Sequence, residues 1–280
     1  MTALIIDVPD MEPDALLLAP VGITTPYDSV TSVRPEGARI VEVLNEPELG
    51  LSALLLEAEG GNVRLTHGVC PAPGTAVYPE SVFAPRSNQY TEASPELALA
   101  SREIASAAGG GAEAIRALVA EAEARFTYAH PEIRFNEGAD RVPYLSCGLT
   151  PGSCIDIHTY LVASLRAAGF EAGYVYGYFF SRESGGQTDD MHCWAVTRHN
   201  GELLEWDVAH HLKAGLGKTR SGLNPRPGHR VAIGHSLGHR YTKGDGGIAD
   251  LKLLAGPLVQ SESGTWNKCR LKVHWMGGQH

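Results

Sequence analysis

A capped helix start is the most constraining feature of this chain. Ser153 and Asp156 have the spacing of a capping box, in which the two side chains satisfy backbone N–H groups at the beginning of a helix. A helix is therefore predicted to begin at Cys154 and to end near Gly169, since apolar residues keep helical spacing between them. Unpaired backbone N–H groups and the helix dipole stabilise an anion at such a start, which favours the thiolate form of Cys154.

A β-hairpin around Asn200 and Gly201 is the second constraint, because Asn-Gly is the strongest two-residue turn signal. A turn at this pair makes the numbers of facing residues sum to 401, so His192 and Asp207 lie on one face, displaced by two positions. Such neighbours are roughly 7–8 Å apart, within reach of long side chains. A histidine held by a carboxylate, with its other nitrogen directed at a thiol, is the arrangement of an activated nucleophile. The same parity directs Cys193 to the opposite face, into the core.

These segments resemble the core of the transglutaminase-like superfamily of cysteine acyl-transfer enzymes. The resemblance covers about residues 95–210 and is carried by the runs PGSCIDIHTYLVASLRAAGFEAGYVYGY, MHCWAV and LLEWDV. It implies an α+β, papain-like or transglutaminase-like core, in which a helix bearing the cysteine packs on an antiparallel sheet bearing the histidine and the aspartate. It further implies Cys154 as the nucleophile, His192 as the base and Asp207 as the orienting acid. Many relatives carry an arginine where this chain has Gly173.

The activity that the resemblance implies is acyl transfer or amide hydrolysis through an acyl-thioester on a Cys-His-Asp triad, without a cofactor. The expected substrate is a small-molecule or peptide amide. Trp194 and Trp206 are predicted to shield the site and to contact this substrate. An arylamine N-acetyltransferase or another biosynthetic acyltransferase stays open, although the Arg-Gly-Gly lead of the former is absent here. A non-catalytic module of the same fold, which binds a peptide or another partner, also stays open.

Other residues offer competing chemistry. Cys147 is a second candidate nucleophile, but it lies in a proline-bounded loop with no helix after it. Ser236 stands in a G-x-S-x-G sequence, the nucleophile elbow of α/β-hydrolases, so a serine hydrolase is an alternative even though no helix is predicted after it. His235 and His239 have the spacing of metal ligands, and His210 lies near the predicted site. No third carboxylate or thiolate ligand is evident, so no metal is assigned.

Charge is unevenly distributed along the chain. The net charge of −9 argues against a nucleic-acid partner, because phosphate contacts need lysine and arginine. Residues 208–244, however, carry seven bases and no acid, and this Gly-rich segment is expected to be a loop beside the site. Arg226 and Arg230 within it are predicted to bind substrate. Two interpretations stay open: the loop steers an anionic substrate, or it is a solvated loop that complements an acidic body.

Two regions are predicted: a β-rich N-terminal region over residues 1–85 and the transglutaminase-like catalytic core over residues 86–280. In the first region, a hairpin is expected to turn at residues 60–62. No apolar run reaches the roughly 18–20 residues of a spanning helix, so no membrane partner is expected. The N-terminus is acidic where a secretion signal would be basic, and the cysteines are sparse and odd in number. Both features indicate reduced thiols in the cytoplasm.

Overall fold

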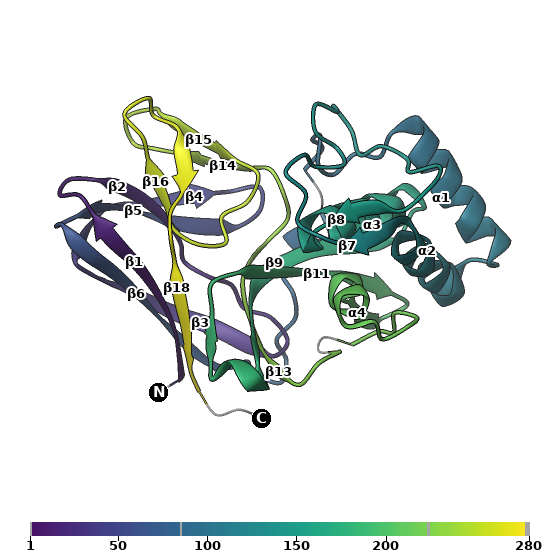
Figure 1. The fold of residues 1–280 in the computed structure, drawn as a ribbon, viewed down its shortest axis with the longest axis horizontal. Helices are drawn as coiled ribbons and strands as arrows, with labels where there is room; N and C mark the ends of the chain where they lie inside the picture. Colours follow the sequence, from purple (N-terminus) through teal and green to yellow (C-terminus); the bar gives the residue numbers. More distant parts are fainter. Residues whose placement is uncertain (1, 85, 223–224, 278–280) are drawn as a thin grey trace. The chain divides into compact units, whose positions relative to one another are not determined.

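The computed structural model describes residues 2–84, 86–222 and 225–277, and the chain divides into two compact units (Figure 1). The first, here called the β unit, comprises Met1–Ser81, Tyr176–Met191 and Pro227–His280. The second, here called the helical unit, comprises Val82–Val175 and His192–Arg226. Strand β9 (Glu171–Ser181) begins in the helical unit and ends in the β unit, so the chain passes from one to the other inside a strand.

The β unit contains two antiparallel sheets that share an apolar core. Among the described residues, the first sheet has the order β10 (Gln187–Thr188), β18 (Lys272–Met276), β1 (Thr2–Met11), β6 (Gly61–Pro71) and β3 (Asp28–Glu36). The second has the order β17 (Trp266–Lys268), β16 (Leu258–Gln260), β2 (Leu16–Pro20), β5 (Leu51–Ala58) and β4 (Ala38–Glu46). Strands β14 (His239–Thr242) and β15 (Ile248–Leu251) form a separate pair. Leu4, Leu17 and Leu65 lie in one buried cluster, so side chains of both sheets fill the same interior.

The hairpin expected at residues 60–62 does not form. Strand β5 pairs with β2 and β4, whereas β6 pairs with β1 and β3, so the turn joins two different sheets. Residues 53–56 of β5 are all buried, which requires cover on both faces of the strand. Because both edges of β5 are already paired, β6 has no edge of it to join, and the glycines at 60 and 61 turn the chain into the other sheet with positive φ.

The C-terminal segment lies in the β unit, whereas the sequence predicts it to be part of a catalytic core over residues 86–280. Strand β18 pairs with β1, and β16 pairs with β2, so the two ends of the chain meet in the same sheets. Pairings between strands this far apart along the sequence leave no local signal in either segment, since each strand alone shows only its own alternation.

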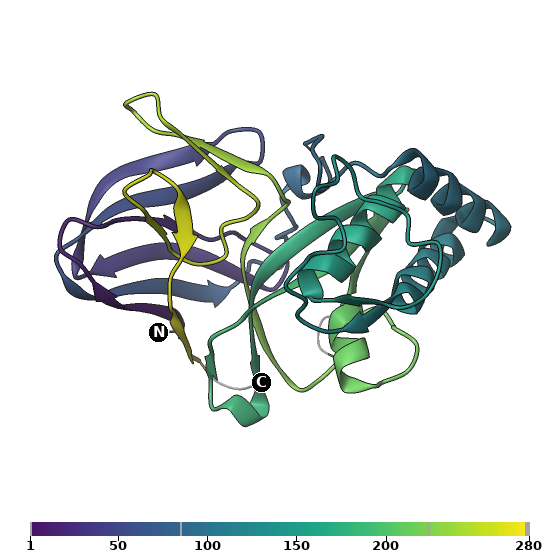
Figure 2. The ribbon, with the colours of Figure 1, turned by 45° about the horizontal axis from the view of Figure 1, so that its top comes forward.

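The helical unit packs α1 (Pro95–Ala107), α2 (Gly111–Arg125) and α3 (Cys154–Ala167) against one another (Figure 2). Its strands are β7 (Phe126–Tyr128), β8 (Thr150–Gly152), β11 (Met191–His199) and β12 (Glu202–Trp206), and β12, β11 and β9 are neighbours in one sheet. Short 3-10 turns stand at η1 (Glu80–Val82) and η2 (Arg182–Ser184). The α+β class predicted from the sequence is confirmed. Within the described residues, no helix has the length and hydropathy needed to cross a membrane.

The basic segment 208–244 is not a continuous loop. It contains α4 (Val208–Ala214) in the helical unit, and β13 (Gly228–His235) and β14 in the β unit. Asp207 caps α4, and apolar residues at 208 and 209 bury the first turn of this helix. The loop expected from the sequence was wrong here, because the many glycines and basic residues suggested a loop where a short capped helix and a buried strand form. Residues 223–224 lie outside the described part of the chain.

The backbone of β9 packs closely against its neighbours in the helical unit at Gly173. A Cβ at this position would lie 2.9 Å from the carbonyl oxygen of Val82 and closer still to its side chain. Arg166 already binds this region, because its Nε donates to the Ala172 carbonyl at 2.7 Å and its Nη2 to the Val82 carbonyl at 3.2 Å. Gly173 therefore leaves no room for the arginine that many relatives carry there.

Gly173→Ala is expected to lower the free energy of unfolding by about 1–3 kcal/mol, because the added methyl group overpacks a filled space. Chemical denaturation measures the loss. Gly74→Ala is the matched control, since a Cβ there would meet no atom within 4 Å. Equal stability of the two variants would contradict the close approach of Val82 to β9.

Candidate active site

Cys154 occupies the first position of α3, where the sequence predicts it. The predicted capping box is present, and the backbone N–H of Ser153 donates to Asp156 Oδ2 at 2.8 Å. Asp156 is fully buried, and its charge is balanced by Arg134, whose Nη1 lies 2.6 Å from the same oxygen. Arg134 comes from the loop before β8 and carries no sequence signal of this role. The start of α3 is therefore fixed by an ion pair to a buried carboxylate as well as by its cap.

The predicted register of the hairpin is confirmed. His199 faces Glu202 and Ala195 faces Trp206, as a sum of 401 requires. The two turn residues, at 200 and 201, both have positive φ, as a type I′ turn demands. Asp207 does not continue the ladder opposite Trp194, because β12 ends at Trp206 and Asp207 becomes the N-cap of α4.

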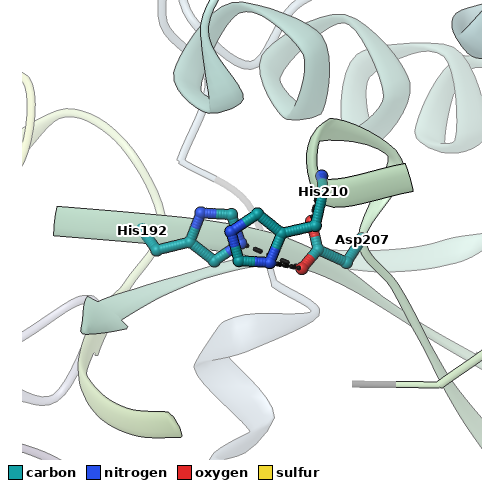
Figure 3. A group of neighbouring side chains, drawn as sticks. All are labelled: His192, Asp207 and His210. Atoms are coloured by element: carbon teal, nitrogen blue, oxygen red, sulfur yellow. Dashed lines mark hydrogen bonds and ion pairs between the residues drawn. The ribbon is translucent and has the colours of Figure 1, made fainter. Parts of the chain in front are cut away.

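His192 and Asp207 are in direct contact (Figure 3). His192 Nε2 lies 2.9 Å from Asp207 Oδ2, and both residues are buried. Because a carboxylate only accepts, this contact places the proton of His192 on Nε2 when the ring is neutral. His192 also acts on the thiol of Cys154, and Nδ1 is the nitrogen that the contact with Asp207 leaves available for it. The triad residues named from the sequence thus lie together in the helical unit.

Cys154 is stabilised as a thiolate. A hydrogen bond from Cys193, followed by the hydrogen bond and positive charge of His192, holds the pKa of Cys154 well below its ordinary value, although burial acts in the opposite direction. Burial and the neighbouring Cys154 raise the pKa of Cys193, so Cys193 remains a thiol that can donate. Cys193 is buried, as predicted, but the sequence did not predict its contact with Cys154. The contact arises because α3 covers this part of β11: Cys193 Sγ also lies 3.6 Å from His158 Nδ1 on that helix.

The other predicted site residues are dispersed. The Trp194 ring lies beside that of His192, with centroids 6.4 Å apart, whereas the Trp206 indole donates to Thr197 Oγ1 at 2.9 Å within the hairpin. Arg226 is exposed in the helical unit. Arg230 is buried in the β unit, where its guanidinium lies over the ring of Phe179. Substrate contacts by these four residues remain predictions.

The context of a nucleophile elbow is absent around Ser236. This residue has a positive φ of 63°, but it joins β13 to β14 rather than a strand to a helix. Its Oγ is 3.0 Å from His235 Nδ1, and His239 Nε2 lies 3.1 Å from the carbonyl oxygen of His235. These buried contacts hold the turn between the two strands. Cys147, the other candidate nucleophile, is exposed in its loop.

One group of potential metal ligands includes His192, Asp207 and His210. The two imidazole rings are stacked, with centroids 3.8 Å apart and planes inclined by 8°. A metal ion must lie close to the plane of each imidazole that binds it, and two nearly parallel planes do not share such a position. The geometry therefore fits two imidazoles on one carboxylate better than a metal centre.

Comparison with known proteins bears on the fold and on the family resemblance. Residues 98–206 match the family model of the transglutaminase-like superfamily, including Cys154 and His192 and ending one residue before Asp207. The predicted transglutaminase-like core is confirmed. The family match supports cysteine-based catalysis in general.

A solved structure from Cytophaga hutchinsonii, described as a candidate cysteine protease, shares the fold with a TM-score of 0.54 at 11% identity, over 98% of this chain and 97% of that one. The periplasmic domain of TgpA from Pseudomonas aeruginosa is also similar, with a TM-score of 0.37 at 13% identity, over 78% of this chain and 92% of that one. No curated protein matches the chain.

His158 makes the transglutaminase-like core sensitive to acid. Its Nδ1 lies 2.9 Å from the carbonyl oxygen of Cys154, and burial lowers its pKa from 6.5 to about 4. The folded core therefore holds His158 neutral, whereas the unfolded chain takes up a proton as the pH falls below 6.5. Protonation of His158 in the unfolded chain therefore does not affect the free energy of unfolding above pH 6.5. As the pH falls from 6.5 toward 4, it lowers that free energy by up to about 1.4 kcal/mol per pH unit.

His158→Leu is expected to flatten this dependence, because the variant has no group to protonate there. Urea denaturation of the wild type and the variant between pH 4 and pH 7 measures it. Burial also lowers the pKa of His67, but His67 is present in both proteins, so the difference between their stability curves reports His158 alone. Parallel stability curves in the two proteins would contradict a neutral His158.

Proposed function

We propose that this protein catalyses cysteine-dependent acyl transfer or amide hydrolysis, with Cys154 as the nucleophile. The observation that carries the proposal is the arrangement of three buried residues in order: a thiolate, an imidazole beside it, and a carboxylate 2.9 Å from the far nitrogen of that imidazole. His192 acts as the base and acid, and Asp207 orients it. The family match over Cys154 and His192 supports the same assignment.

The reaction begins when the Cys154 thiolate attacks the carbonyl carbon of an amide. The backbone N–H of Cys154, at the first position of α3, has no partner within the helix and is the proposed donor to the developing oxyanion. The His192 imidazolium gives its proton to the departing amine, and an acyl-thioester remains on Cys154. Water or a second amine then gives a proton to His192 and attacks the thioester. The thiolate leaves, and the ion pair is restored.

Asp207 stabilises the charged form of His192 in this cycle. Its side chain is fully buried, so the contact with His192 is little screened by solvent. The carboxylate also accepts from the backbone N–H of His210 at 3.0 Å, which holds it at the start of α4. This support keeps the carboxylate aimed at His192 while the proton moves between His192 and the substrate.

The substrate proposed here is an anionic small-molecule or peptide amide. The first part of the basic segment lies in the helical unit, directly after Asp207, and includes Lys213, Lys218 and Arg220. Lys218 lines a cavity of about 500 Å³ together with Tyr128 and Leu212. An anionic amide is expected to lose more of its kcat/KM between low and high salt than a neutral analogue, because salt screens its attraction to these bases. Equal salt dependence of the two substrates, measured by steady-state kinetics, would contradict steering.

Cys154→Ala is expected to lower amide turnover by about a thousandfold or more, because the acyl-thioester cannot form. Initial rates on a panel of amides, with and without an added amine, measure the loss, and mass spectrometry of rapidly quenched protein detects the acyl group on Cys154. Cys147→Ala and Ser236→Ala are the controls and are expected to keep wild-type rates. Undiminished turnover by Cys154→Ala would remove the proposed nucleophile, and loss of turnover in Ser236→Ala would favour a serine hydrolase.

A further inference from the structure

A second imidazole, that of His210, lies on the Asp207–His192 pair. His210 Nδ1 is 3.0 Å from Asp207 Oδ2, the oxygen that His192 Nε2 approaches at 2.9 Å. Figure 3 shows both contacts converging on this one oxygen. The two rings are face to face, 3.8 Å apart, and His210 is buried. Burial, stacking on His192 and a close approach to the Asp207 carboxylate thus occur together at His210, which indicates a role in the site.

The local structure of α4 brings His210 to this place. Asp207 is the N-cap, and His210 is the third residue of the first turn, so its backbone N–H donates to Asp207 Oδ1 at 3.0 Å. One carboxylate oxygen is thus held by the backbone of His210, while the other lies between two imidazoles. The backbone bond to Oδ1 and the hydrogen bond between Oδ2 and His192 restrict rotation of the carboxylate, and the close approach of His210 Nδ1 to Oδ2, which is not an aligned hydrogen bond, packs against it.

The stack acts on the His192 ring itself. An imidazole that is bonded only through Nε2 can still turn about its Cα–Cβ and Cβ–Cγ bonds. A flat ring 3.8 Å away blocks one face of His192 and removes part of this freedom.

We propose that His210 is a positioning residue of this site: it fixes the Asp207 carboxylate and the His192 ring in the orientation that activates Cys154. The inference rests on the proposed function, because it assigns His210 a role only in activating that thiolate. His210 acts through Asp207 and His192 rather than on the substrate. Neither the family match, which ends at residue 206, nor the sequence pattern assigns this role.

Three variants separate the two contacts of His210. His210→Ala removes the stack and the side-chain contact with Asp207. His210→Asn keeps a side-chain N–H near the position of Nδ1, and His210→Phe keeps a flat ring without a nitrogen. His211→Ala is the control for damage to α4, since it removes a buried imidazole whose Nδ1 bonds the backbone carbonyl of Asp207, at 2.8 Å, rather than its carboxylate.

The readout is the rate of Cys154 alkylation by iodoacetamide as a function of pH, followed by mass spectrometry of the Cys154 peptide. His210→Ala is expected to slow alkylation at neutral pH by between about tenfold and a hundredfold and to move its acid limb to higher pH, because a less well oriented imidazolium stabilises the thiolate less. His210→Asn and His210→Phe are each expected to recover part of the rate. The other titratable groups around the site come from α3, β9, β11, α4 and its N-cap, and all are unchanged in the three His210 variants: Asp156, His158, Tyr174, His192, Cys193, Asp207 and His211.

Alkylation of His210→Ala within twofold of wild type, with the same acid limb, would overturn the inference. Equal losses in all three variants and in His211→Ala, in proportion to the fall in Tm, would also overturn it, since they would show a structural role only.

A second measurement does not depend on the reactivity of Cys154. The imidazole proton of His192 that faces Asp207 is expected to give a downfield NMR resonance that vanishes in His192→Ala. This resonance should also be lost in His210→Ala and persist in His210→Asn, and its persistence in His210→Ala would overturn the positioning role. Wild-type alkylation of Cys154 no faster than that of Cys147 would instead count against the proposed function, so the two failures are distinguishable.

Discussion

The site depends on the buried carboxylate of Asp207, both oxygens of which have hydrogen-bond partners. Removing Asp207 from water costs several kcal/mol unless hydrogen bonds and opposite charge replace the lost solvation. The backbone N–H of His210 and the imidazole of His192 supply that replacement, at 3.0 and 2.9 Å. Asp207, held in this way, orients the His192 ring, and His192 in turn stabilises the thiolate form of Cys154. The buried Asp156, paired with Arg134, fixes the other side of the site by the same physical rule.

The parts of the site that could be predicted from the sequence are those set by local chemistry. Ser153 and Asp156 are three residues apart, and their capping box requires nothing from the rest of the fold. Asn200 and Gly201 adopt positive φ at low cost, so they determine the register of the hairpin by themselves. Helix start and hairpin register together place a cysteine at the beginning of a helix and a histidine close to an aspartate, and the packing of α3 on β11 then brings the cysteine to them.

The parts that could not be predicted depend on contacts between distant segments. Arg134 reaches Asp156 from a loop without regular structure, and no spacing in the sequence connects the two. Cys193 meets Cys154 only because α3 packs over β11, which strand parity alone does not describe. In the β unit, the pairing of β1 with β18 joins the two ends of the chain. The covered edges of β5 likewise show why a glycine-rich turn between two strands is not always a hairpin.

The proposed chemistry and the proposed positioning of His192 both require a thiolate at Cys154, so the ionisation of this thiol is the decisive property to measure. Ultraviolet difference absorbance between the wild type and Cys154→Ala, recorded as a function of pH, isolates the titration of this one thiol. The expected midpoint lies well below the roughly 8.5 of a free cysteine, with a return toward that value in His192→Ala. A midpoint at or above that of a free cysteine would contradict it, since burial would then outweigh the hydrogen bonds from Cys193 and His192.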